Sequence, residues 1–315
     1  MKTFNEIFEE LRNIDNNELN EAWKEAYEER EKNKKRAGKI CLIIDIFFLI
    51  MIFKNGFNKG SLFSIFFTLA LNIIIFALTT AIFSKGYRNY SRIYKSTVIN
   101  KLMSNFYNNL EYFPHKSMYR KIYDEAGYRE YYNKYHSEDY MEAQINNKYS
   151  IQMAEILTQE ERTRRDSNGN TETETITRFH GLFAKVLMDK SINGELRIEE
   201  NGTMLFDKKR LEMDSSEFEK YFDVKTSDKI LGMQLLTADI MEELIQFKNE
   251  TNIKYNVYIR NNKIYLRFHS GEMFEAGNLK KGPLDRETIR KYFYMLNFTY
   301  NLSNKLINLV NDTAI

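Results

Sequence analysis

Four histidines are the side chains of this 315-residue chain best suited to acid–base or metal chemistry, and they are widely separated: His115, His136, His180 and His269. His180 and His269 each follow a phenylalanine in a stretch that predicts a β-strand. The two could therefore approach each other across a sheet and act as a base or as a metal-binding pair. The alternative, which we favour, is that both are strand histidines with ordinary hydrogen bonds.

Asp45 is a second candidate, because it lies in an apolar stretch where an ionised carboxylate is costly. Asn72, in the next apolar stretch, could hydrogen-bond to it. An ion pathway through these residues would require an oligomer, since two helices offer little polar lining. The sequence contains no phosphate-binding loop, no HExxH and no GxSxG. We therefore assign no catalytic residue, no cofactor and no metal ligand.

Two apolar stretches organise the chain, Ile40–Phe53 and Leu62–Phe83. The second has 22 residues without a charge, and the first has 14 residues and includes Asp45. About 20 apolar residues in a helix cross a bilayer core of roughly 30 Å. We therefore predict a transmembrane hairpin in the lipid bilayer, with spans at about 39–55 and 62–83. The alternative for the first span is a re-entrant or tilted segment.

Basic residues predict how this hairpin is oriented. Five lie at 32–39, two in the loop 54–61 and four at 85–95. Because positive residues favour the cytoplasmic side, both termini are expected there. The abundance of Lys, Asn, Ile and Tyr is typical of an AT-rich bacterial genome. We therefore predict a multi-pass protein of the bacterial cell membrane.

Charge and cysteine content exclude several classes of function. The net charge of +2 gives no large positive field, so we expect no nucleic-acid partner. Cys41 is the single cysteine, which excludes a disulfide within the chain and a multi-cysteine zinc site. The tyrosine-rich stretch 116–140 could stack on bases, but packing tyrosines are the better interpretation because its charge is near balance.

The remaining patterns predict an α+β fold. We expect an N-terminal amphipathic helical segment at 1–38, the hairpin at 39–84 and a helical stalk at 85–113. A cytoplasmic α+β domain, an antiparallel β-sheet flanked by helices, would fill 114–315. Its expected elements are a long hairpin over 149–188, a second hairpin turning at Asn261-Asn262, a helix capped at Thr237 and a final helix from Asp285 to about Val310.

Three motifs of the cytoplasmic part resemble one bacterial family. They are Phe-His-Gly-Leu-Phe at 179–183, Glu-Phe-Glu-Lys at 217–220 and Leu-Thr-Ala-Asp-Ile-Met at 236–241. The chain resembles the domain-of-unknown-function family number 3137, whose layout is an N-terminal helix, two spans and a cytoplasmic domain. The resemblance implies no activity and no catalytic residues. Family members are often encoded beside LemA-family proteins, which suggests a LemA-like membrane protein as a partner.

Taken together, the sequence favours a membrane-anchored binding or scaffold module that faces the cytoplasm. One alternative is an enzyme with a site near His180 and His269. The other is a component of an oligomeric channel or transporter that uses Asp45 and Asn72, with a second copy of the chain as partner. A polar face shared by both spans would favour the channel, and titratable groups clustered in a concave pocket would favour the enzyme.

Overall fold

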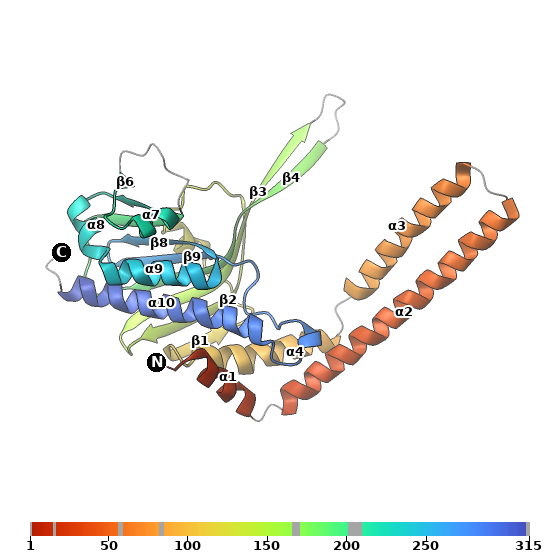
Figure 1. Cartoon of the computed structure of the whole chain (residues 1–315), viewed down its shortest axis with the longest axis horizontal. Helices are drawn as coiled ribbons and strands as arrows, with labels where there is room; N and C mark the ends of the chain where they lie inside the picture. The colour runs from red at the N-terminus through yellow and green to blue at the C-terminus, as the bar shows by residue number, and fades with distance from the viewer. Residues whose placement is uncertain are drawn as a thin grey trace. The chain divides into compact units, whose positions relative to one another are not determined.

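The computed structural model describes residues 2–14, 17–55, 59–81, 85–165, 171–200 and 210–312 (Figure 1). The chain divides into two compact units. The first, which we call the sheet unit, contains Met1–Leu11, Val98–Glu275 and Arg286–Ile315. The second, the helical unit, contains Arg12–Thr97 and Ala276–Asp285. Each is treated below as a separate body.

Nine strands in the described part of the sheet unit form one antiparallel sheet, in the order β1-β2-β3-β4-β9-β8-β5-β7-β6. Their bounds are β1 Asn108–Phe113, β2 Lys134–Ile145, β3 Tyr149–Arg165, β4 Thr171–Leu187, β5 Glu195–Glu200, β6 Arg210–Leu211, β7 Phe222–Thr226, β8 Lys254–Arg260 and β9 Lys263–His269. The inner strand β4 pairs with its chain neighbour β3 and also with β9, which comes much later in the sequence.

Local turn signals account for the two predicted hairpins, and both predictions are confirmed. The chain from Tyr149 to Leu187 forms the long hairpin β3–β4, although 166–170 of its polar tip lie outside the described residues. Strands β8 and β9 join at Asn261, whose φ of 55° is the left-handed value that a tight hairpin turn uses and that Asn tolerates.

Helices cover one face of the sheet (Figure 1). The helices of the sheet unit are α1 Phe4–Asn13, α5 Asn100–Met103, α6 Arg120–Asp124, α7 Ser216–Tyr221, α8 Lys229–Leu235, α9 Ala238–Thr251 and α10 Arg286–Asp312. The Thr237 side chain caps α9 by accepting from the backbone N–H of Ile240, as predicted. Phe298 of α10 stacks on Phe247 of α9 at 4.2 Å, and both rings contact Phe268 of β9.

The opposite face is covered by α6 and the irregular segment that follows it. Side chains alternate along a strand, so Phe268 points to the helices while Arg267 and His269 point to this opposite face. Over β3 and β4 the cover is apolar: Tyr123 of α6 packs on Phe179 and Phe183, at 5.9 and 5.1 Å between ring centroids. Over β9, β8 and β5 it is polar, and there the candidate site lies.

The helical unit consists of α2 Asn17–Asn55, α3 Lys59–Ala81, α4 Lys85–Tyr94 and the short 3-10 turn η2 Leu279–Lys281. Helix α2 packs against both α3 and α4. Gly86 lets α4 approach closely, because a Cβ there would lie 3.2 Å from the Ala26 Cα. The Trp23 indole N–H donates to the Leu279 carbonyl oxygen at 2.9 Å, which fixes η2 to α2.

The predicted transmembrane hairpin is wrong. Among the residues described, none of the helices combines the length and the apolar character that crossing a bilayer demands. The apolar part of α2 has 14 residues and continues directly from a charged segment. The predicted membrane fold class and multi-pass localisation are therefore wrong as well. Residues 82–83 of the second predicted span lie outside the described residues.

The helix predicted from Lys85 to about Tyr112 is shorter than expected. Helix α4 passes into a single π-helical segment, η1 Lys95–Ile99, and then α5 ends at Met103. Residues 108–113 form the strand β1 instead. After Phe106, the spacing of the apolar residues also fits the alternation of a β-strand. The Asn108-Asn109 pair, with Asn109 at φ 49°, favours a turn over a continuing helix.

Candidate functional site

The two strand histidines lie on opposite faces of the sheet. Leu182 of β4 pairs with Phe268 of β9, so His180 points to the helix-covered face while His269 points to the other. The ring of His269 packs edge-on against Phe179 at 5.1 Å. The structure therefore does not bring the two together as a base or metal pair.

His180 bonds to a buried carboxylate instead. Its Nε2 lies 3.0 Å from Oε1 of Glu155, which is 5% exposed, and the other carboxylate oxygen accepts the Met273 backbone N–H at 2.6 Å. Burial raises the pKa of Glu155, although both hydrogen bonds act to lower it. These bonds hold the loop in which Phe274 has a φ of 57°, so Glu155 has a clear structural role.

Asp45 and Asn72 are brought together within the helical unit. The Asn72 amide donates from Nδ2 to Oδ1 of Asp45 at 2.6 Å, joining α2 to α3. The Asn72 side-chain oxygen is buried and has no hydrogen-bond partner among the described residues. This is the contact expected from the sequence, and it links the two helices through one hydrogen bond.

A polar pocket lies on the face of the sheet that α6 and the irregular segment after it cover, over β9, β8 and β5. It encloses about 200 Å³. Its lining residues are Tyr128, Arg129, Glu130, Arg197, Glu199, Glu200, Lys225, Lys254, Asn256, Tyr258, Arg267 and His269. Gly127, with a φ of 69°, ends the helical turn of α6 and directs the next three residues across the strands. The pocket therefore forms between a sheet face and an irregular loop, a common location for binding sites.

Arg267 forms the inner end of this pocket, and it is 4% exposed. Its guanidinium makes two parallel 2.9 Å hydrogen bonds to the Glu130 carboxylate and donates to the Tyr123 hydroxyl at 3.3 Å. The Tyr128 ring lies 4.1 Å from the guanidinium carbon. A bidentate, stacked arginine of this kind is held in one orientation. We call Arg267, Glu130, Asn256, Tyr123 and Tyr128 the Arg267 cluster.

Asn256 is oriented by this arginine. Arg267 Nε donates to Asn256 Oδ1 at 3.3 Å, so the oxygen of the amide must face the arginine and its Nδ2 must face away. Asn256 is 4% exposed, and no hydrogen bond joins its Nδ2 to any described residue. The amide therefore presents two N–H donors at the floor of the pocket.

Glu199 lies beside Asn256 on the neighbouring strand β5. The register that pairs Ile198 with Val257 places the two side by side on the same face. Glu199 Oε1 accepts from the Tyr258 hydroxyl, and Arg197 lies over the Tyr258 ring at 4.9 Å. Burial raises the pKa of Glu199, while nearby cations such as Lys225 and Arg197 act to lower it. A desolvated carboxylate of this kind favours a cationic partner.

Two further polar atoms at this site are buried and unpaired among the described residues: the Tyr128 hydroxyl and His269 Nε2. Burial lowers the pKa of His269 to about 3, and the charges of Arg267 and Lys254 act in the same direction, so its imidazole is neutral. An unpaired buried polar group costs about 1–3 kcal/mol. Stability is thus reduced at this site, which is a feature of functional sites.

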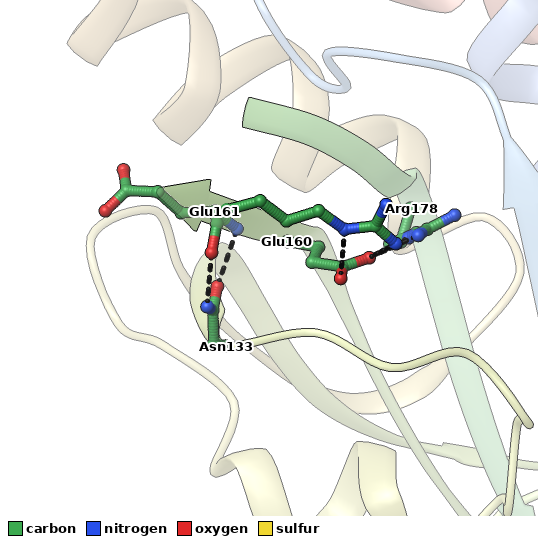
Figure 2. A network of polar contacts seen from close by, with 5 residues as sticks. Asn133, Glu160, Glu161 and Arg178 are labelled. Atoms are coloured by element: carbon green, nitrogen blue, oxygen red, sulfur yellow. Dashed lines mark hydrogen bonds and ion pairs between the residues drawn. The ribbon is translucent and has the colours of Figure 1, made fainter. Parts of the chain in front are cut away.

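A second charged group on the same sheet is shown in Figure 2, and none of its residues lines the pocket. Glu160 of β3 bonds to Arg162 at 2.6 and 3.0 Å and to Arg178 at 3.1 Å. The Asn133 side chain makes two 2.8 Å hydrogen bonds to the backbone of Glu161. The two arginines lower the pKa of Glu160 to about 2. We call Glu160, Arg162 and Arg178 the Glu160 cluster.

No metal site emerges in the part of the chain that the structure describes, because no three His, Cys, Asp or Glu side chains gather closely enough to hold an ion. The pocket residues other than His269 were not predicted from the sequence. Their signal was the polar side of two alternating strands, Lys254, Asn256 and Tyr258 on β8 and Tyr265, Arg267 and His269 on β9. That alternation is also typical of a solvated face.

Comparisons with known proteins bear on the family alone. No curated protein and no solved structure matches the chain. The predicted LemA-like partner and second copy stay predictions. Residues 177–307, which run from β4 into α10 and include most pocket residues, match the family model described as "Protein of unknown function (DUF3137)". The resemblance to this family drawn from the sequence is thereby confirmed over this region.

Proposed function

We propose that the sheet unit is a binding module whose pocket takes a small anionic ligand. The observation that carries this proposal is the gathering of five cationic side chains at one cavity: Arg129, Arg197, Lys225, Lys254 and Arg267. Three carboxylates, Glu130, Glu199 and Glu200, share the lining, so the formal charge of the pocket is +5 − 3 = +2.

Two of the three carboxylates are paired with cations of the protein, and the third, Glu199, accepts a hydrogen bond from a neutral hydroxyl. Glu130 is bound by Arg267, Glu199 accepts from Tyr258, and Glu200 pairs with Lys248 at 2.6 Å. By contrast, no ion pair joins Lys254 or Arg129 to a carboxylate among the described residues. Cations that line a concave surface attract anions more strongly than isolated surface charges do.

The cavity size limits the ligand to a small molecule. About 200 Å³ is below the roughly 300–1,000 Å³ typical of pockets that hold drug-sized ligands. A protein segment or a nucleic acid would need a longer groove. The ligand class that fits is a metabolite-sized anion, such as a short dicarboxylate or a phosphate.

The test is isothermal titration calorimetry on the full chain with succinate, glutarate and inorganic phosphate. We expect at least one of the three to bind, and Lys254→Gln to weaken that binding about tenfold, because it removes one charge-assisted contact. Lys121→Gln is the matched control, since Lys121 is an exposed lysine of α6 outside the pocket. The proposal fails if none of the three anions binds, or if the two variants weaken binding equally.

A further inference from the structure

The floor of the pocket pairs a fixed donor with a fixed acceptor. Arg267 orients Asn256 so that Nδ2 faces away from the arginine, and Tyr258 occupies one oxygen of Glu199. No hydrogen bond joins the other Glu199 oxygen to any described residue. A carboxylate oxygen and an amide N–H thus lie side by side on β5 and β8, where the sheet register holds both.

A simple anion uses only part of this arrangement. Its negative charge suits Lys254, Arg129 and the Asn256 N–H groups, but it would be repelled by Glu199. A ligand with a cationic group satisfies Glu199 as well, because an ammonium donates to the open carboxylate oxygen. The half-buried position of Glu199 strengthens this preference, since a partner of opposite charge offsets the cost of partial desolvation.

We propose that the ligand is a small amino acid-like zwitterion, whose ammonium group binds Glu199 and whose carboxylate binds Asn256 and Lys254. This inference rests on the proposed function, because it identifies the class of carboxylate ligand that the same pocket takes. It assigns Glu199 and Asn256 the role of selecting the ligand and leaves the attraction of the anion to the surrounding cations.

The neighbouring contacts explain why the site would hold its shape without a ligand. The bidentate Arg267–Glu130 pair fixes Arg267, Arg267 fixes Asn256, and the Tyr258 hydroxyl fixes Glu199. Tyr258 is itself held between the Tyr128 ring, at 4.7 Å, and Arg197. Binding to groups that are already positioned avoids the entropy cost of ordering them.

The test compares glutarate with glutamate, which share a carbon skeleton and differ by one amino group. Calorimetry on the full chain should give glutamate an affinity at least about tenfold higher, as expected for one charge-assisted hydrogen bond. In Glu199→Gln this ratio should fall to about one or below, while glutarate binding is kept or improved. The control Glu172→Gln, at an exposed position of β4, should keep the wild-type ratio.

The two proposals fail in different ways. If glutarate binds the wild type as well as glutamate does, the zwitterion is ruled out and the anion-binding proposal stands. If neither compound nor inorganic phosphate binds, the proposed function itself is overturned. Because Glu199→Gln keeps the shape of the side chain, its thermal unfolding should match the wild type; should it not fold, the glutamate-to-glutarate ratio of the wild type alone still decides the inference.

Discussion

The Arg267 cluster and the Glu160 cluster are two arginine–carboxylate networks on one sheet, and they differ in what surrounds them. The Glu160 cluster has no unpaired buried atom among the described residues, and its arginines are 32% and 42% exposed. The Arg267 cluster is 4% exposed at its arginine, borders a cavity and contains the unpaired Tyr128 hydroxyl. Paired charges alone therefore do not mark a site; unpaired neighbours and open space do.

The largest expected effect comes from removing the partner of the buried arginine. Glu130→Gln leaves the Arg267 charge without its carboxylate, and we expect it to destabilise the protein by about 2–3 kcal/mol. This is below the full value for a buried pair because the Glu130 side chain is 35% exposed. Urea unfolding measures it. A loss no greater than that of Arg178→Met, which leaves Glu160 paired with Arg162, would remove the distinction between the clusters.

A smaller effect is expected from His269→Gln, on the stability of the protein in acid. The pKa of His269 is lowered from 6.5 to about 3 in the folded protein, so its contribution to stability is present above about pH 6.5 and is lost as the pH falls toward 3. His269→Gln should therefore flatten the decline in stability between pH 6.5 and 5, a range in which Glu160 does not titrate. Thermal unfolding across this range measures the slope. An unchanged slope would mean that His269 is not buried in its neutral form.

The smallest effect on stability is expected from Glu160→Gln at neutral pH, because both arginines can be hydrated when the carboxylate loses its charge. The substitution is expected to change the pH dependence of stability instead. The pKa of Glu160 is lowered from 4.5 to about 2, so its stabilising contribution is present above about pH 4.5 and is lost as the pH falls toward 2. The variant should lose less stability than the wild type over that range. An equal loss in both would show that the two arginines do not act on Glu160.

Features that depend on local sequence could be predicted, and features that depend on register could not. The cap at Thr237, the turn at Asn261 and the strand through Phe183 all follow from neighbouring residues. The faces of His180 and His269 depend instead on which residue of β4 meets which residue of β9, and a shift of one residue reverses a face. Periodicity alone does not specify that register.

The pocket could not be predicted from the sequence for a related reason. Glu130 and Arg267 are 137 positions apart, and Glu130 belongs to an irregular loop with no pattern of its own. The alternation of polar and apolar residues on β8 and β9 is typical of a sheet with two different faces. It could not indicate that a loop from far earlier in the chain covers the polar one. The apolar stretches misled in the opposite way, since their length and lack of charge predicted a membrane-crossing hairpin that the described helices do not form.

Helix α1 packs on the last helix of the chain, where Phe4 meets Phe293 at 5.5 Å between ring centroids. During protein synthesis at about 5–20 residues per second, the residues of α1 leave the ribosome roughly 15–60 s before that partner exists. A shorter delay of about 4–17 s affects β4, because Leu182 pairs with Phe268, 268 − 182 = 86 residues later. The apolar side of α1 and the open edge of β4 are therefore exposed on the nascent chain. Cells that make this protein must keep both from aggregating until translation is nearly complete.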